Sequence, residues 1–312
     1  MILVKEMLEA SHTDGERVDG EILVQSYGVQ KTKFDKEYLS GVLMAGTTIP
    51  FKVWNNFTAF QTMKDTDLSG KVVHITGAYS LYKDSVSISI ETITESTTAQ
   101  VDDFLEVRYN AEAYGNALKT IVQQNVSEKG MSLANKVLFE NEKVWQRFTT
   151  EFAARTHHDC FKSGLLAHTY KVTSLMTVVL NLYGAKLCHN QDEKDLYVLG
   201  ALFHDIGKID EYNIGNVTRK SIVTHQYLGV EYLDKDFIVS TYNEEWYYHL
   251  VSIILQHHGE WGMPPKSIGA KIVHQVDLLE SMVQGIIQDT EGRTPKDTIK
   301  VDDSYLYQYN YE

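Results

Sequence analysis

The chain has few cysteines and no long apolar run. Two cysteines occur among 312 residues, and their spacing forms neither a CxxC pair nor a zinc-finger pattern, so we expect free thiols in a reducing compartment. No stretch approaches the roughly 18 apolar residues of a membrane-spanning helix. The opening MILVKEMLEA becomes charged too soon for a secretory signal. These absences predict a cytoplasmic protein that does not enter the membrane.

Basic residues are also scarce. The 29 Lys and Arg are outnumbered by 42 Asp and Glu, which gives a net charge of −13. Nucleic-acid binding normally uses clustered basic residues, so this balance argues against a broad electrostatic footprint. It still allows a narrow groove lined by aromatic residues, or a site in which bound divalent ions supply the positive charge. With 43% hydrophobic residues and no low-complexity tract, the chain is predicted to be globular, and its length allows two domains.

Residues 18–98 show the period-two alternation of β-strands. Five short stretches rich in Val, Ile, Thr, Tyr and Phe are separated by turn signals: EILVQSYGV, EYLSGVLM, TIPFKVWNN, KVVHITGAYSLY and SVSISIETI. Five strands before any strong helix predict a small barrel. The OB-fold is the common five-stranded choice, and an SH3-like barrel is the alternative.

The pattern changes near residue 100, where apolar residues begin to recur three and four positions apart. The segments with this helical period are 104–123, 131–153, 162–183, 193–206, 221–234, 244–258 and 267–287. The sequence therefore predicts an α+β multidomain chain. An OB-like nucleic-acid-binding β-barrel occupies residues 1–100, and an all-α domain occupies residues 101–312.

The string FHDIGK in the helical part carries an adjacent His204 and Asp205, near the end of a helix that Gly207 is expected to terminate. His168 shares an apolar helical stripe with aliphatic residues, and Asp277 lies in a helix rich in Leu, Val and Ile. A buried, unpaired carboxylate costs several kcal/mol, so Asp277 must find a cation or hydrogen-bond donors.

Further histidines lie on the apolar side of two other predicted helices: His225, His257 and His258. A single histidine of this kind is more often a core or surface residue, but the recurrence on consecutive helices favours a metal site. Mixed imidazole and carboxylate ligands suit Mn, Fe, Zn or Mg, with one or two ions and open positions for water and a phosphate oxygen. Lys208 is placed to reach such an oxygen; a solvated lysine at a helix end is the simpler alternative.

Five strings resemble, in the same order, a known family: HHDCFKSGLLAHT (157–169), LFHDIGK (202–208), THQYLGVEYL (224–233), ILQHHGEWGMP (254–264) and HQVDLLES (274–281). The family is the HD superfamily of metallophosphohydrolases, and within it the YhaM-like group of 3′-5′ exoribonucleases that join an OB-fold to an HD domain. Ala167 stands where that group usually has an acidic residue, and Gln275 and Val276 replace small residues, as in a divergent or phage-encoded member.

The resemblance implies roles for individual residues. His168, His204, Asp205 and Asp277 are expected to hold one metal ion, and His225, His257 and His258 a second. Asp205, Lys208 and His158 are the expected catalytic residues, with Lys208 on a phosphate and His158 near the substrate. The implied metal is Mn²⁺, with Fe, Mg, Zn and Ni as alternatives, and self-association of the chain is also implied.

Aromatic and basic residues of the predicted barrel are candidates for contacts with single-stranded nucleic acid, because bases stack on aromatic rings and lysines follow the backbone. About half of the barrel aromatics must form its core. The basic stretch KTKFDKE (31–37) is the expected strand-guiding element. The candidate binding residues are Lys31, Lys33, Phe34, Lys36, Trp54 and Tyr82.

Three functions are compatible with these features. The leading hypothesis is a metal-dependent 3′-5′ exonuclease that hydrolyses single-stranded RNA, or DNA, with metal-activated water. The second is a phosphohydrolase or phosphodiesterase of small nucleotides, and the absence of GYP after HHGEWGMP weighs against its cyclic-dinucleotide form. The third is a non-catalytic nucleic-acid-binding protein with a structural metal.

Overall fold

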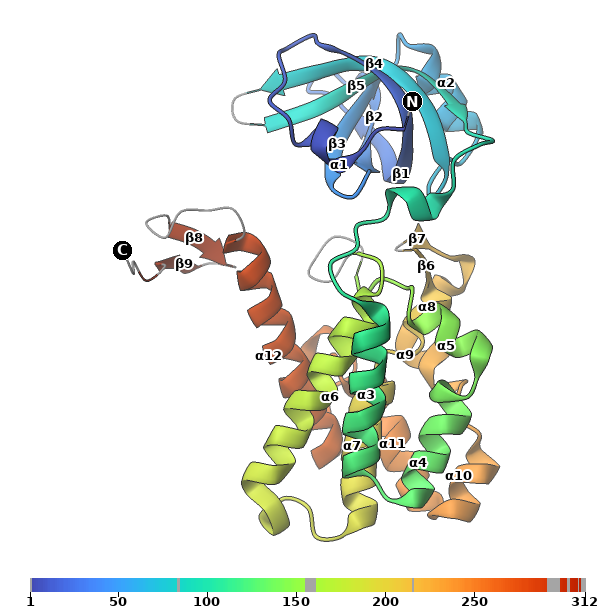
Figure 1. Cartoon of the computed structure of the whole chain (residues 1–312), viewed down its shortest axis with the longest axis vertical. Coiled ribbons are helices and arrows are strands. Elements are labelled where there is room, and N and C mark those ends of the chain that lie inside the picture. Colours follow the sequence, from blue (N-terminus) through green and yellow to red (C-terminus); the bar gives the residue numbers. More distant parts are fainter. Residues whose placement is uncertain are drawn as a thin grey trace. The chain divides into compact units, whose positions relative to one another are not determined.

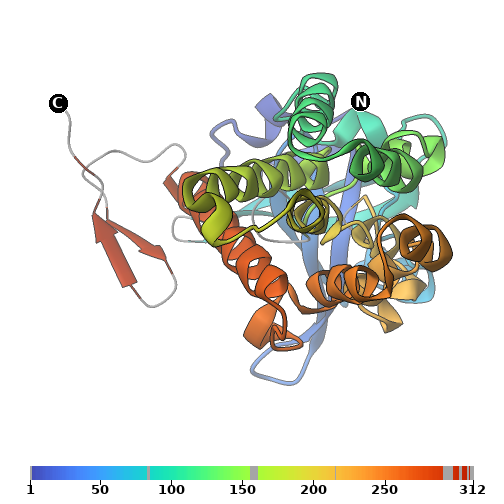
Figure 2. The ribbon, with the colours of Figure 1, turned by 90° about the horizontal axis from the view of Figure 1, so that it is seen from below.

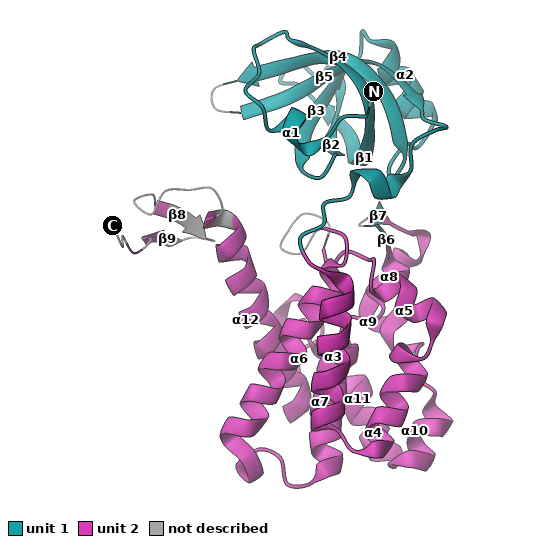
Figure 3. Ribbon diagram, in the orientation of Figure 1, with its two compact units in different colours: residues 1–108, 213–216 teal, residues 109–212, 217–312 magenta. Residues whose placement is uncertain are grey.

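The computed structural model describes residues 2–82, 85–154, 161–214, 216–290, 298–301, 304–307 and 309. They form two compact units, coloured separately in Figure 3: residues 1–108 with 213–216, and residues 109–212 with 217–312. Among the described residues, no helix combines the length and the apolar character needed to cross a bilayer. Cys188 is a free thiol, whereas Cys160 lies outside the described residues.

The first unit is a closed five-stranded barrel (Figure 1). Its strands are β1 (Arg17–Lys31), β2 (Glu37–Met44), β3 (Thr48–Trp54), β4 (Val72–Tyr82) and β5 (Ser85–Glu95). They follow the order β1-β2-β3-β5-β4, with β1 closing on β4 and with β3 and β5 parallel. This Greek-key order is that of an OB-fold, so the predicted fold is confirmed.

Short helices accompany the barrel: α1 (Lys5–Leu8), α2 (Thr58–Asp65) and η1 (Val101–Phe104). Successive side chains of β3 point to opposite faces of the sheet. Ile49, Phe51 and Val53 are buried in the barrel, while Lys52 and Trp54 point outward. Tyr27 ties α2 to the barrel: its hydroxyl donates to the Met63 carbonyl oxygen at 2.9 Å.

The second unit is mainly helical. Its α-helices are α3 (Ala111–Asn125), α4 (Glu128–Ala134), α5 (Glu142–Phe148), α6 (Gly164–Tyr183), α7 (Gln191–Phe203), α8 (Lys208–Glu211), α9 (His225–Val230), α10 (Lys235–Thr241), α11 (Glu244–Gln256) and α12 (Ile268–Thr290). The shorter turns are the π-helix η2 (Asn135–Phe139) and the 3-10 helices η3 (Gly184–Lys186), η4 (Arg219–Ile222) and η5 (Gly259–Trp261).

Helix α7 is the centre of this unit. It contacts α3, α4, α6, α11 and α12, and it is seen end-on among its neighbours in Figure 2. Its last turns are buried from Leu196 to Phe203 in one hydrophobic core with side chains of the surrounding helices. His204 follows the last residue of α7, so the HD string begins inside the most enclosed part of the unit.

Several boundaries differ from the sequence expectation because asparagines begin new helices. The Asn110 side chain accepts the Ala113 amide and starts α3 at Ala111, not at residue 104. Asn141 accepts the Val144 amide and starts α5, which divides the segment expected at 131–153. Residues 101–312 are mainly helical, as predicted; their described part adds two small two-stranded sheets, β6 (Tyr212–Asn213) with β7 (Asn216–Val217) and the antiparallel pair β8 (Thr298–Val301) with β9 (Ser304–Tyr307).

Candidate metal centre

Seven candidate side chains converge from five helices of the second unit. His168 lies on α6, His204 and Asp205 directly follow α7, and His225 begins α9. His257 and His258 directly follow α11, and Asp277 lies on α12. Their donor atoms form two groups, each with its members within 4.8 Å of one another: Asp205, His225, His257 and His258 in one, and His168, His204 and Asp277 in the other.

Asp205 joins the two groups. Its Oδ1 lies 3.3 Å from His225 Nε2 and 3.4 Å from His257 Nε2. Its Oδ2 lies 3.4 Å from the Nε2 atoms of both His168 and His204. The carboxylate is buried, and each of its oxygens faces a different pair of imidazoles.

The turn after α7 depends on a glycine, but not for the reason expected from the sequence. Gly207 was expected to end the helix in a left-handed conformation, yet α7 ends at Phe203 and Gly207 has a φ of −68° at the start of α8. A Cβ at this position would lie 2.0 Å from the His225 carbonyl oxygen and 2.4 Å from the Gly229 amide nitrogen. Gly207 therefore allows α8 and α9 to approach closely, which brings His225 to Asp205.

In four of the imidazoles, Nδ1 points away from the centre and lies within hydrogen-bond distance of an acceptor. His168 Nδ1 lies 2.7 Å from Glu280 Oε2, and His225 Nδ1 lies 2.7 Å from Glu211 Oε2. Backbone carbonyl oxygens serve the other two: Ala201 for His204 Nδ1 at 2.7 Å and Ile254 for His257 Nδ1 at 2.8 Å. Neither glutamate is among the sequence-predicted residues, although each follows a predicted residue, Lys208 or Asp277, by three positions on a helix.

Charge and burial oppose each other in this centre. Burial raises the pKa of Asp205, but the charge of Lys208 and the neighbouring imidazoles outweighs burial, so its pKa lies well below the usual range. Burial lowers the pKa of His168, yet its contacts with Asp205, Asp277 and Glu280 raise it well above the usual value. Burial, together with the charges of His257 and His225, lowers the pKa of His258 to about 3.

The residues present fit a bound cation. Asp205 Oδ1 and His257 Nε2 are buried side-chain atoms without a hydrogen-bond partner, 3.4 Å apart. The Nε2 atoms of His168 and His204 face each other at 3.2 Å, and so do those of His225 and His258. Converging ring nitrogens and a carboxylate are the donor set that Mn, Fe and Zn prefer. A cation between them would satisfy the unpartnered atoms.

The remaining predicted site residues are placed as follows. Lys208 Nζ lies 2.6 Å from Asp205 Oδ2. His158 lies outside the described residues. In the barrel, Phe34 and Tyr82 are 74% and 72% exposed, Lys33 Nζ lies 5.0 Å from the centroid of the Phe34 ring, and Lys31 pairs with Asp35 at 2.8 Å.

Trp54 has a neighbour that suits stacking. It is paired with Tyr38 on β2, and the centroids of their rings are 5.1 Å apart. Lys36 is exposed in the turn between β1 and β2, whereas Phe51 and Tyr79 belong to the barrel core. The structure thus shows which aromatic residues of the barrel point outward and which belong to its core, a distinction that the sequence periodicity alone did not give.

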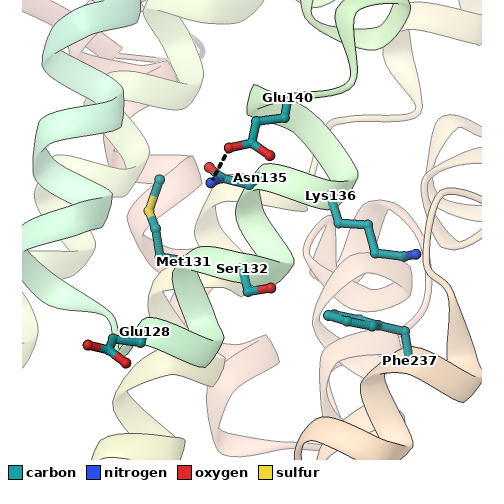
Figure 4. A pocket seen from close by; sticks show the side chains of 7 residues that line it. All are labelled: Glu128, Met131, Ser132, Asn135, Lys136, Glu140 and Phe237. Carbon is teal, nitrogen blue, oxygen red and sulfur yellow. Dashed lines mark hydrogen bonds between the residues drawn. The ribbon is translucent and has the colours of Figure 1, made fainter.

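The second unit also has an open hollow of about 650 Å³, shown in Figure 4. It is lined by Glu128, Met131, Ser132, Asn135, Lys136, Glu140 and Phe237, none of which belongs to the candidate centre. Three of its polar side chains have partners: Asn135 Nδ2 donates to Glu140 Oε1 at 2.7 Å, and Lys136 pairs with Asp234 at 3.2 Å. The hollow therefore adds nothing to the metal-ligand set.

Comparison with known proteins finds similarity in the helical unit and along most of the chain. Residues 165–282 match the family model of the HD domain. The 3′-5′ exoribonuclease YhaM of Bacillus subtilis strain 168 is 27% identical over 283 residues, which cover 86% of each chain. YhaM of Listeria monocytogenes serovar 1/2a is 25% identical over 320 residues, 96% of this chain and 97% of that one.

One solved structure is a partial match to the chain. The mitochondrial single-stranded DNA-binding protein Rim1 of S. cerevisiae covers 28% of this chain and all of its own, with 13% identity and a TM-score of 0.25. A barrel with OB-fold strand order followed by an HD domain defines the class of this protein.

Within that class the chain is similar to the YhaM exoribonucleases over most of its length, the resemblance that its sequence motifs predicted. An HD domain implies that it binds a divalent metal, and the HD match and these relatives support a hydrolase.

Proposed function

We propose that this protein is a metal-dependent 3′-5′ exonuclease that hydrolyses phosphodiester bonds of single-stranded nucleic acid, with RNA as the preferred substrate. The observation that carries the proposal is the convergence of seven imidazole and carboxylate side chains around buried, unpartnered Asp205 Oδ1 and His257 Nε2. The YhaM relatives, which are named 3′-5′ exoribonucleases, support the direction and the substrate class.

The proposed ligands follow the two groups of donors. His168, His204, Asp205 and Asp277 hold one divalent ion, and His225, His257 and His258 hold a second that shares Asp205. We propose Mn²⁺ as the metal. When bound, such ions lower the pKa of water and neutralise charge on a phosphate.

Asp205 and Lys208 have further roles. Asp205, itself a ligand, presents one oxygen to each group and so sets the distance between them. Lys208 places a half-buried ammonium beside Asp205, and from there it supplies positive charge to a phosphate oxygen as negative charge develops in the transition state. His158 is proposed to lie near the substrate, as the family motif implies.

The barrel is proposed to bind the single strand. OB-folds bind oligonucleotides on the face of strands 2 and 3 and on the adjoining loops. In this barrel that face carries Tyr38, Lys52 and Trp54, which offer stacking surfaces and a positive charge. The residues proposed to extend the surface lie in the β1–β2 loop and at the ends of β1 and β4: Lys31, Lys33, Phe34, Lys36 and Tyr82.

Self-association is the remaining part of the proposal. Helix α12 exposes an apolar face made of Leu278, Leu279, Met282, Val283 and Ile287. Exposed apolar surface of this kind is typical of protein interfaces. Measurement of the molar mass in solution by light scattering tests it, and a mass equal to one chain across the working concentrations would reject it.

The function is tested with a 5′-labelled single-stranded RNA of about 20 nucleotides, longer than the span of one OB-fold, incubated with the protein and Mn²⁺. We expect products that shorten stepwise from the 3′ end, and none with Asp205→Ala. The same variant should bind the RNA within a few fold of the unmodified protein, because the barrel is intact. Hydrolysis of mononucleotides without cleavage of RNA or DNA would instead favour a small-nucleotide phosphohydrolase.

A further inference from the structure

Two glutamates outside the ligand set contact histidines of the candidate centre, each at the ring nitrogen that points away from it. We propose that Glu280 and Glu211 are positioning residues, each of which sets the metal affinity of one half of the centre by holding one histidine. The inference rests on the proposed metal centre and adds residues that neither the motifs nor the ligand geometry assign.

The contacts are matched in the two halves. Glu280 Oε2 lies 2.7 Å from His168 Nδ1, and Glu211 Oε2 lies 2.7 Å from His225 Nδ1. Glu280 is 4% exposed, and the side chain of Glu211 is 13% exposed. Both histidines turn the opposite nitrogen, Nε2, toward Asp205. Each half of the centre therefore contains one histidine backed by a carboxylate.

A carboxylate behind a histidine acts on the ligand in two ways. It keeps the proton on Nδ1, which leaves the Nε2 lone pair for a metal, and it holds the plane of the ring. Its negative charge also makes the ring a stronger donor than a neutral acceptor does. His204 and His257 have only backbone carbonyl oxygens in that position. His168 and His225 should therefore contribute most to the affinity of their respective halves.

Each glutamate is itself held in place. Lys171 Nζ lies 3.0 Å from Glu280 Oε1 and 2.8 Å from Gln284 Oε1, which joins α6 to α12 around this carboxylate. Glu211 is adjacent to Asp210, whose carboxylate is contacted by Arg147 Nη1 at 3.0 Å and by Tyr232 OH at 2.7 Å.

The contacts of Asp210 fix the short helix α8, and with it Glu211. The two supports come from different helices, so they can be removed independently.

The test replaces each glutamate by glutamine, which keeps the shape and removes the charge, and by leucine, which also removes the acceptor. Metal-free protein is titrated with Mn²⁺ in equilibrium dialysis without substrate, and bound metal is measured by elemental analysis. We expect each glutamine variant to bind one ion about tenfold to a hundredfold more weakly, with the other ion unchanged, and leucine to weaken it further. Glu193→Gln is the matched control, because Glu193 accepts the Tyr197 hydroxyl on α7 and contacts no candidate ligand.

A second measurement does not require the variants to fold. In the unmodified protein loaded with diamagnetic Zn²⁺, ¹⁵N NMR of the histidine rings should show the proton of His168 and of His225 on Nδ1. A proton on Nε2 of either ring would overturn the assignment for that half. Unchanged affinity for both ions in all four variants would overturn the whole inference.

These outcomes separate the inference from the proposed function. Metal affinity and ring protonation are measured without nucleic acid, so loss of one ion in a glutamate variant supports the inference even if RNA is not cleaved. A protein that binds a single ion, with affinity unaffected by one of the two substitutions, would refute the role of that glutamate. A protein that binds no ion would reject both.

Discussion

Lys208 Nζ lies 2.6 Å from Asp205 Oδ2; the aspartate is buried, and the lysine side chain is 13% exposed. Burial lowers the pKa of Lys208, but the charge of Asp205 raises it above its usual value, so the lysine is an ammonium. The pair neutralises one carboxylate of a centre rich in carboxylates and imidazoles. A metal ion at Asp205 and the ammonium therefore compete for the same oxygen.

Replacing Lys208 by methionine should separate metal binding from hydrolysis. Without the ammonium, Asp205 is more negative, so Mn²⁺ should bind more tightly, while the rate of hydrolysis should fall about 10²- to 10³-fold for loss of one charge-stabilising donor. Metal content and kcat on an RNA substrate are measured on the same preparation. Weaker metal binding in this variant would contradict the expected competition, and Lys208→Arg controls for the loss of charge.

Metal removal should lower the stability of the helical unit without unfolding it. The unit has its own hydrophobic core, from Leu118 on α3 to Val276 on α12, which does not depend on the candidate ligands. An ion at a hundred times its Kd stabilises the folded state by about 2.7 kcal/mol. We expect a chelator to lower the Tm by several degrees in calorimetry and to leave the helical circular dichroism intact at 25 °C. Loss of the helical signal on chelation would show that the ion is needed for folding.

Gly207→Ala should be strongly destabilising. The added Cβ would lie 2.0 Å from the His225 carbonyl oxygen, so α8 and α9 must move apart. We expect a loss of about 4 kcal/mol or more in the free energy of unfolding, measured in urea, together with weaker metal binding. Gly285→Ala is the control: it lies in α12 with no atom within 4 Å of the new Cβ, and it should stabilise the protein by about 0.5 to 1 kcal/mol. Equal effects at the two positions would contradict the close approach at Gly207.

Trp54→Ala and Tyr38→Ala should weaken the binding of single-stranded RNA by about 1 to 3 kcal/mol each, because a base–aromatic stack is lost. Fluorescence anisotropy of a labelled oligonucleotide gives the Kd, measured in the Asp205→Ala background to prevent cleavage. His74→Ala, which removes an exposed ring from β4, is the control and should change the Kd by less than a factor of about 2. If His74→Ala were as damaging as Trp54→Ala, the face of β2 and β3 would not be the binding surface.

Tyr242→Phe tests how much one hydrogen bond to the buried Asp195 carboxylate, away from the centre, contributes to stability. The Tyr242 hydroxyl donates to Asp195 Oδ2 at 2.7 Å, and its ring stacks on Trp246 with 3.9 Å between centroids. Phenylalanine keeps the stack and removes the hydrogen bond, so the free energy of unfolding should fall by about 1 to 3 kcal/mol. Tyr248→Phe, at a half-exposed tyrosine, should change it by less than about 0.5 kcal/mol. A similar small effect at Tyr242 would mean that Asp195 is satisfied by its other donors.

Several ligand candidates were visible in the sequence because a polar side chain interrupts an apolar helical stripe, whereas His204 and Asp205 were found through the HD string. His168, His225 and His257 are all buried, as the stripe pattern required. Glu280 was not predicted, because its role depends on which face of α12 meets α6, and a single helix does not reveal its neighbour. Gly207 was misassigned for the same reason: a glycine after a helix can end that helix or admit another element, and only the contact with His225 decides.

The barrel shows a similar limit. Five alternating segments predicted its strands and its fold class, which depend on local periodicity. Periodicity did not predict which of its aromatic residues are buried and which are exposed, because strand register decides whether Phe51 or Trp54 points inward. The boundaries of α3 and α5 were displaced by Asn110 and Asn141, whose capping role is visible in the sequence only once the helix start is known.

The acceptors behind the four imidazoles also have a thermodynamic consequence. Because Glu280, Glu211 and two backbone carbonyls orient the rings from outside, little conformational entropy remains to be lost when an ion enters. If the proposed ions bind, we expect a preformed metal site, and not a chain that folds around its metal. The identity of the ion would then be decided by donor chemistry and by the divalent ions available in solution after the chain has folded, and we expect that the same polypeptide can be emptied and reloaded with a different metal.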